Sequence, residues 1–379
     1  MWWRALACGV LPVVWFAAGP GPAVAQNPGS PPVVPRVATG VTAFIGVVPD
    51  DVKALGGRLA PANQPIFLTS LSGFVRKFGD FTALSPSWST EDVIAHRQLQ
   101  LAVRGFFGNG GFRAWVLRVN TIDDMTDLRD ELRALRPIDV DLVVVPGATS
   151  QAQHEAILQH VALAGDRFAL LDARLDPQRY DYAALRSTTV SSDRATLLAP
   201  WIVVQDPATG GDVSQPPSGH VAGVIARNDS RRGVHRAPAN LEVAGALAPE
   251  HGLSTAEIEA LTMHGVLVLR PGSTGRGTRT WGARTLGGRE DPQFRYISVR
   301  RTVDFVRESL LEGLGSDDCA TAPGPTATFL LDLWSSGMLQ GAKASEAFFV
   351  RCDRAGDPLK IGLALQRPTE FILLTIKLN

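Results

Sequence analysis

The sequence predicts a mixed α/β protein in which helices cover both faces of a sheet. Residues 41–48 (VTAFIGVV) are apolar and rich in β-branched side chains, which predicts a buried strand. Short apolar segments of this kind then alternate with amphipathic helical segments. This alternation is typical of a sheet buried on both faces. The last segment, residues 370–378, differs because its apolar side chains recur with a period of two, which predicts a strand with one apolar face.

The elements follow one another in chain order. Strands are expected where short apolar runs are bounded by turn residues, at residues 41–48, 65–70, 113–119, 141–145, 167–172, 197–205, 266–269, 346–352 and 370–378. Helices are expected between these runs, at residues 71–78, 90–107, 123–135, 151–164, 255–262, 302–314 and 327–338. The run Asn109-Gly110-Gly111 should end the second of these helices, because glycine closes many helices.

Length and charge restrict the class of protein. The chain has 379 residues, enough for two or three domains, and 45% of them are hydrophobic, as in a globular protein. Lys+Arg and Asp+Glu are equal at 37 each. A net charge near zero argues against a nucleic-acid partner, which usually requires a basic excess. It also leaves copies of the chain free to associate with one another.

The N-terminus resembles a signal for export. Residues 5–18 are apolar but too few for a membrane span, which needs about 20, so no stable membrane insertion is expected. Ala23 and Ala25 then form an A-x-A cleavage pattern before Gln26. We expect residues 1–25 to be a signal peptide and the protein to reach the periplasm or the extracellular space. The alternative is a start codon placed too far upstream. Residues 26–40 should form a proline-rich arm.

Two cysteines, Cys319 and Cys352, remain beyond the N-terminal segment. In an exported protein they could form one disulfide. They could equally be two small, unpaired buried residues. The sequence leaves both alternatives open.

Motifs for catalysis, metals and cofactors are missing from the sequence. Its seven histidines are scattered, and no H-E-x-x-H, C-x-x-C, EF-hand, P-loop or G-x-S-x-G pattern occurs. The glycine-rich run GFFGNGG at residues 105–111 follows a predicted helix and precedes a strand, the reverse of a nucleotide-binding turn. We therefore expect no catalytic residue, no metal and no cofactor.

The richest local pattern is QPPSGHVAGVIARNDSRRGVHRAPANLEVAG, residues 215–245. Its first prolines, with Ser218 and Gly219, should form a turn into a helix. The small residues Ala222, Gly223 and Ala226 would let another backbone approach that helix closely. Residues 237–240 (APAN) should form a fixed corner.

This stretch resembles a motif of the contractile tail sheath family of phages, tailocins and related injection systems, PPSGHVAGVYARTDxxRGVWKAPAN. The block TWGARTL at residues 280–286 resembles a second motif of that family, and further blocks follow in the family's order from about residue 40 to the end. The matching residues of the two motifs are Pro216, Pro217, Ser218, Gly219, Ala222, Gly223, Arg227, Asp229, Ala237, Pro238, Ala239, Asn240, Trp281, Gly282 and Arg284.

The resemblance implies a fold and a role. Residues 41–275 would form the N-terminal and middle α/β domain, with a subtilisin-like scaffold, and residues 276–379 the C-terminal sheath domain. The protein would be a structural subunit of a virion-like tail sheath and not an enzyme. It would polymerise with itself around an inner tail tube protein, contact baseplate components, and contract to drive the tube through a target envelope. Its last strand would be exchangeable between subunits, through Phe371, Ile372, Leu374, Ile376 and Leu378.

Two departures from the family leave alternatives open. Proline-rich residues 27–36 replace the strand-like segment with which the family usually begins. Ordinary sheaths also assemble in the cytoplasm, whereas this chain begins with a signal-like segment. An exported, non-contractile sheath-like filament is therefore the main alternative. A diverged α/β enzyme is a distant one, because it would need a nucleophile and a base that the sequence does not identify.

Overall fold

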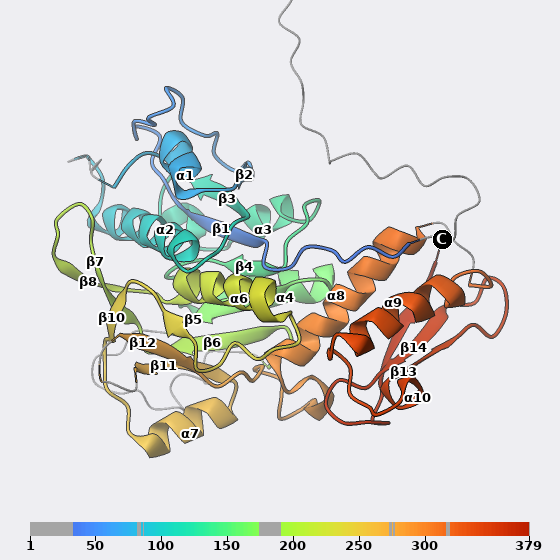
Figure 1. The fold of residues 1–379 in the computed structure, drawn as a ribbon. Helices are drawn as coiled ribbons and strands as arrows, with labels where there is room; N and C mark the ends of the chain where they lie inside the picture. The colour runs from blue at the N-terminus through green and yellow to red at the C-terminus, as the bar shows by residue number, and fades with distance from the viewer. Residues whose placement is uncertain are drawn as a thin grey trace, which may run out of the picture.

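The structure is a computed structural model that describes residues 33–81, 85, 87–173, 191–272, 275, 277–315 and 319–378. The predicted signal peptide and the first part of the proline-rich arm lie outside the described residues. Within them the chain forms a larger α/β body and a smaller C-terminal module, connected by one long helix (Figure 1). The predicted mixed α/β class is confirmed.

A nine-stranded mixed sheet forms the centre of the body, in the order β2-β3-β1-β4-β5-β6-β11-β12-β9. Its six inner strands, from β3 to β11, pair in parallel, and the strands at both edges pair antiparallel. The strands are β1 (Thr42–Val47), β2 (Ile66–Leu68), β3 (Ala114–Val119), β4 (Leu142–Val144), β5 (Phe168–Asp172), β6 (Ala195–Ala199), β9 (Glu242–Val243), β11 (Val266–Pro271) and β12 (Thr278–Trp281).

Helices cover both faces of this sheet, and each face has its own hydrophobic cluster. One cluster packs α1 (Leu71–Phe78), α2 (Thr90–Gly108) and α6 (Ser218–Arg232) against side chains such as Phe44. The other packs α3 (Arg129–Ala134), α4 (Gln151–Ala164) and α7 (Thr255–Met263) against the opposite face, through side chains such as Ile45. Phe44 and Ile45 are neighbours on β1 that point to opposite faces, as strand geometry requires.

Two predicted elements are wrong in the same way, because each is divided. Residues 197–205 form β6 and then β7 (Ile202–Gln205), which belongs to a separate sheet with β8 (Asp212–Gln215) and β10 (Ala246–Pro249). Pro200 lies between them and has no amide hydrogen for a ladder. Residues 123–135 form the 3₁₀ turn η1 (Asp123–Met125) and then α3, because Leu128 adopts a left-handed φ of 59°. The Leu128 side chain is fully buried there.

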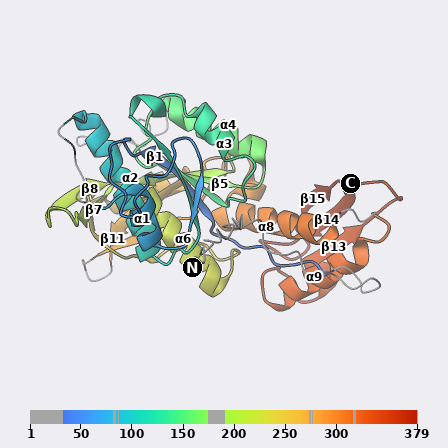
Figure 2. The same cartoon turned by 90° about the horizontal axis from the view of Figure 1, so that it is seen from above.

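The C-terminal module has a third hydrophobic cluster, formed between helices and a small antiparallel sheet. Its sheet has the order β13-β14-β15, with β13 (Phe348–Arg351), β14 (Leu359–Leu363) and β15 (Ile372–Ile376). The helices are α8 (Ile297–Leu314), α9 (Pro323–Ser335) and α10 (Ala344–Ala347). Helix α8 begins five residues before the predicted start at 302 and leads from the body into the module (Figure 2). The first residues of the predicted strand 346–352 are helical, in α10.

Helix α6, which carries the first family motif, packs directly on α2 through small residues. A Cβ atom added at Gly219 would collide with the backbone of Ala102, and one at Gly223 with the backbone of Phe106. Ala222 lies between these glycines and is fully buried. The close approach predicted from the small residues of this stretch therefore occurs, and α2 is the backbone that approaches.

We expect Gly223→Ala to destabilise the protein, because the added methyl group has no space against α2. Overpacking of this kind typically costs about 1–3 kcal/mol. Gly108→Ala is the matched control, since a Cβ there meets nothing within 4 Å and the residue ends the same α2 helix. Urea denaturation of both variants measures the difference. Equal stability of the two variants would contradict the packing role of Gly223.

Candidate functional site

The first turn of α6 is held by a carboxylate from the sheet. Pro217 occupies the N-cap position, so the helix has no capping side chain of its own. Asp172, at the end of β5, takes this role: its two carboxylate oxygens accept hydrogen bonds from the Ser218 hydroxyl at 2.8 Å and the Ser218 amide at 3.1 Å. The amide of Gly147 is a third donor, at 3.2 Å. Pro216 and Pro217 therefore lead the chain into a helix whose start is fixed by β5.

The Ser218–Asp172 pair is placed for structure and not for catalysis. Ser218 is 0% exposed and Asp172 is 1% exposed, so a substrate has no access to the serine. Burial raises the pKa of Asp172 to about 7, although its hydrogen bonds oppose the rise. His220, two residues along α6, packs its ring against Gly105 of α2. Burial, together with the charge of Arg104, lowers the pKa of His220 to about 4.

The last turns of α6 carry the motif's charged residues. Asp229 is buried and forms a bidentate ion pair with Arg301 of α8, at 2.7 and 3.1 Å. Although burial opposes its charge, the carboxylates of Asp229 and Asp141 raise the pKa of Arg301. Arg227 instead reaches outward and donates to the carbonyl of Glu242 in β9. Asp229 thus joins α6 to the helix that leads into the C-terminal module.

A second arginine on α8 makes a parallel set of contacts. Arg300 donates to Asp304, one turn along, at 2.8 Å and to Asp193 at 3.2 Å. Arg194, beside the start of β6, also donates to Asp304, at 3.0 Å. Arg300 and Asp304 have side chains only 8% and 6% exposed. Adjacent arginines on α8 therefore bind carboxylates on two different parts of the body.

An acidic group faces the same junction from the sheet. Asp141, just before β4, is half-buried and accepts a hydrogen bond from the Val41 amide at 2.8 Å. Burial raises its pKa to about 8, although Arg301 opposes the rise. Glu308 lies one turn beyond Asp304 on α8. Burial, together with nearby carboxyl groups that include Asp141 and Asp166, raises the pKa of Glu308 to about 9.

The remaining motif residues form fixed corners around β12. In the corner Ala237-Pro238-Ala239-Asn240, the Asn240 residue has a left-handed φ of 58°, and its amide donates to the Thr280 carbonyl at 2.6 Å. Trp281 ends β12 and stacks under the guanidinium of Arg270, 3.5 Å from the ring centre. Gly282 has a φ of 86°, and Arg284 makes an isolated bridge with Tyr296. These residues connect the sheet edge to the start of α8.

The predicted assembly strand lies in its own subunit's sheet. Ile372, Leu374 and Ile376 are buried in the third cluster, and Leu378 is half-buried beside it. The ring of Phe371 packs edge-on against that of Phe349. β15 pairs only with β14 within the described chain, so it is an outer strand of the sheet. On its other face Leu373 is 70% exposed.

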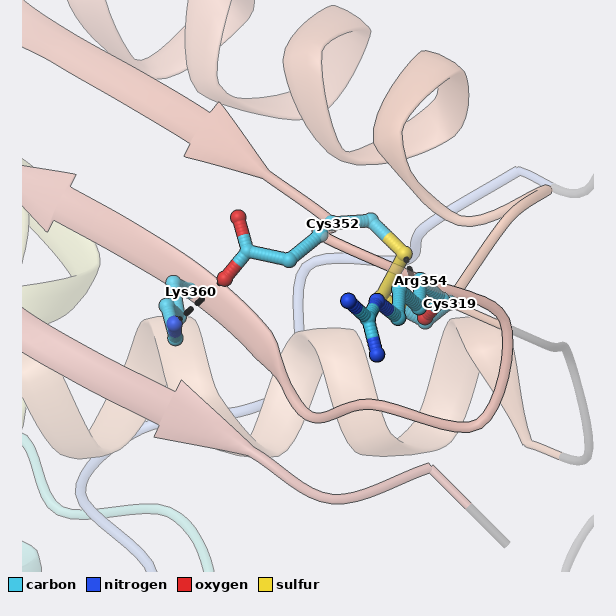
Figure 3. The surroundings of a disulfide bond; sticks show 5 residues. Cys319, Cys352, Arg354 and Lys360 are labelled. Carbon is cyan, nitrogen blue, oxygen red and sulfur yellow. Dashed lines mark hydrogen bonds and ion pairs between the residues drawn. A yellow bond between two sulfur atoms is a disulfide. The ribbon is translucent and has the colours of Figure 1, made fainter.

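The two candidate cysteines are joined. Cys319 precedes α9 and Cys352 follows β13, with their Cα atoms 5.6 Å apart (Figure 3). The bridge spans 33 residues of sequence. On the chain-entropy view, closing a loop of this length stabilises the fold by roughly 3–4 kcal/mol. Next to it, Lys360 and Asp353 form an exposed ion pair at 2.5 Å.

Metal and membrane sites are not found in the part of the chain that the structure describes. No three or more His, Cys, Asp or Glu side chains there are grouped to bind a metal ion. Among the same residues, no helix combines the length and the apolar character that crossing a bilayer would require.

Comparison with known proteins matches these elements to one family. Residues 123–286 match the family model of the phage tail sheath protein central domain. This segment is similar to the central domain of phage tail sheath proteins. The matched segment runs from η1 through β12 and includes both motifs. The resemblance inferred from the sequence is thereby confirmed.

Relatives of the sheath domain extend the match. A tail sheath protein of Burkholderia phage BcepMu is 28% identical over 182 residues, 45% of this chain. A putative prophage major tail sheath protein of Pseudomonas aeruginosa is 27% identical over 199 residues. The two alignments cover 38% and 49% of these relatives, so this chain spans less than half the length of either. Two solved structures share the fold over 97% of this chain at 23% identity. They are the PVC sheath of an extracellular contractile injection system and the anti-feeding prophage helical sheath, both contracted, with TM-scores of 0.70 and 0.69.

Sequence reasoning missed the residues that hold α6 and α8 in place. Asp172 holds the start of α6, and Arg300 and Arg301 bind α8 to the body, with Asp141 facing Arg301. None of these residues belongs to a motif that predicts its contacts. A signal was nevertheless present, because Arg300 and Arg301 interrupt an otherwise apolar helical pattern. Buried arginines need carboxylate partners, so this interruption indicated acidic residues elsewhere in the core.

We expect Asp229→Asn to lower the free energy of unfolding by about 3–5 kcal/mol, because it leaves Arg301 buried without its full counter-charge. Asp130→Asn is the matched control. Asp130 pairs with Arg133 on the surface, where an ion pair contributes about 1 kcal/mol or less. Chemical denaturation measures both losses. A loss from Asp229→Asn no greater than that of the control would show that the buried pair is not an anchor.

The raised pKa of Glu308 gives a pH dependence with a defined sign. The folded protein holds this proton up to about pH 9, whereas the usual value is 4.5. The contribution of protonated Glu308 to the free energy of unfolding is therefore complete below about pH 4.5 and is lost as pH rises through about 9. Glu308→Gln removes the ionisation, so its melting temperature relative to wild type should be higher at pH 9 than at pH 5.

The control is Glu312→Gln, an exposed glutamate one turn further along α8. Its melting temperature should follow that of wild type at both pH values. Calorimetry at pH 5 and pH 9 makes the comparison. A Glu308→Gln offset that does not change with pH would contradict the assignment.

Proposed function

We propose that this chain is a structural subunit of a helical, tail-sheath-like tube that surrounds an inner tube. The match to sheath structures over almost the whole chain, together with the sheath central domain, supports this role. The partners would be further copies of the chain, an inner tail tube protein and baseplate components. The buried Ser218–Asp172 pair gives no support to an enzymatic alternative.

The observation that best supports this proposal is the unpaired edge of the C-terminal sheet. Among the described residues β15 has a neighbour on one side only, and an unpaired strand edge readily accepts another strand. A head-to-tail contact of this kind that does not close generates a helical polymer. Because β15 buries its apolar face in its own module, we propose that its outer edge, with Leu373, contacts a neighbouring subunit. Exchange of the whole strand would first have to expose Ile372, Leu374 and Ile376.

Contraction fits a subunit in which the body and the module move together. α8 contributes Ile297 to the body's cluster and Val303 to the module's cluster. Its buried arginines fix it to the body, so flexibility would lie in the links between subunits and not within one subunit. We propose residues 41–275 and 276–379 as the two domains, with α8 as their shared element.

A second candidate, an exported filament that does not contract, is favoured by one observation. Disulfides persist mainly in oxidising compartments, and Cys319 and Cys352 form one here. Export through a cleaved N-terminal segment would agree with this chemistry. Mass spectrometry of native particles distinguishes the candidates, since a first residue of Gln26 indicates export and an intact Met1 indicates assembly inside the cell.

We expect Leu373→Lys to reduce polymerisation at least tenfold without changing the stability of the monomer, because the charge is placed at the proposed contact while the buried face of β15 is untouched. Thr328→Lys is the control, because Thr328 is exposed on α9 of the same module and does not belong to β15. Sedimentation and electron microscopy measure assembly. Normal tubes from Leu373→Lys would exclude this edge, and wild-type protein that never polymerises would exclude the function.

A further inference from the structure

The loop that the disulfide closes contains the least buried strand of the C-terminal module. The 33-residue interval between Cys319 and Cys352 contains α9, α10 and β13. β13 has four residues, none of which is buried, whereas four of the five residues of its neighbour β14 are buried. β13 is also an outer strand, paired only with β14 among the described residues. The bridge follows directly after its last residue, Arg351 (Figure 3).

The two sulfur atoms differ in their access to solvent. Cys319 is 2% exposed and belongs to the third hydrophobic cluster. Cys352 is only half-buried, at the margin of that cluster. A thiolate from outside therefore has a route to the Cys352 sulfur that it lacks to the Cys319 sulfur.

We propose that the Cys319–Cys352 disulfide is a redox switch that holds β13 at the edge of the C-terminal sheet, and that reduction of the bridge prevents assembly. The proposal rests on the sheath function proposed above. The oxidised protein presents a fixed three-stranded sheet to its neighbours. The reduced protein presents a sheet whose outer strand is free to leave.

The reductant is a dithiol, either a small molecule or a protein. One of its thiolates attacks the Cys352 sulfur, and Cys319 departs as a thiolate that takes up a proton. The second thiol of the reductant then attacks its own sulfur in the mixed disulfide. This releases Cys352, which also takes up a proton. Two electrons pass to the cysteines, and the reductant becomes a disulfide.

After reduction, β13 would be held by its ladder with β14 and by partly buried side chains. The ladder has four residue pairs. Phe348 and Val350 pack at the margin of the third cluster, and Phe349 contacts Phe371, but no residue of β13 is fully buried. The nearby Lys360–Asp353 ion pair is about half exposed at both ends, and exposed pairs contribute little. Without the bridge, the segment from 319 to 352 regains the freedom that the closed loop had removed. Departure of β13 would leave the edge of β14 open to unselective pairing.

Hydrogen exchange tests the switch directly on the wild-type protein, with and without dithiothreitol. After reduction, the amides of β13 should exchange at least about tenfold faster, while those of β1 in the body stay unchanged. Polymerisation, followed by sedimentation, should fall at least about tenfold. The variant C319A/C352A should behave like reduced wild type and should not respond to dithiothreitol.

Two control variants isolate the bridge. Asp353→Asn breaks the neighbouring ion pair and keeps the disulfide, so its exchange should match oxidised wild type. Cys8→Ser removes the third cysteine and should keep the full response to dithiothreitol.

The outcomes separate the switch from the sheath function. Unchanged β13 exchange on reduction overturns the switch, whether or not the protein polymerises. Faster β13 exchange with equal polymerisation in both states also overturns it. If neither the oxidised nor the reduced protein polymerises, the sheath function itself is contradicted. The proposed effect of the disulfide on assembly is then contradicted as well.

Discussion

The bidentate ion pair between Arg301 and Asp229 is the constraint on which the arrangement of the two parts depends. It is buried at the point where α6, α8 and the sheet meet. A buried guanidinium without its carboxylate is unfavourable by several kcal/mol, so α8 can leave this position only at that cost. The pair therefore fixes the direction in which the C-terminal module leaves the body. Arg300 and Asp304 of α8 add two further ion pairs to the body, with Asp193 and Arg194.

This anchoring bears on the contacts that the proposed assembly would use. α8 contributes to two hydrophobic clusters and so joins the module to the body. In the proposed sheath, variable geometry would therefore lie in the contacts between subunits. The sheet edge at β15 and the disulfide beside β13 lie at opposite sides of the same three-stranded sheet. Within the described residues, the β15 edge is unpaired, while the disulfide lies beside the β13 edge.

The sequence located the motif but assigned its chemistry only in part. The small residues of α6 predicted close backbone approach, and Gly219 and Gly223 provide it against α2. Glycine is informative in this way because its lack of a Cβ is a local property. The partners of Ser218 and Asp229 could not be predicted, since Asp172 and Arg301 are 46 and 72 residues away. No local pattern encodes a pairing between side chains so distant in the chain.

The sequence by itself determined the α/β class, most strands and helices, and the resemblance to tail sheath proteins, because hydrophobic periodicity, turn residues and motifs are local signals. Only the tertiary structure decided that two continuous sequence patterns, at residues 123–135 and 197–205, form two elements each. Burial of Leu128 outweighs the helical pattern of residues 123–135, and Pro200 sends the chain into a second sheet. It also decided that β15 covers its own module. Its period-two pattern specifies one apolar face, but which surface covers that face depends on the position of α8, which distant charges hold in place.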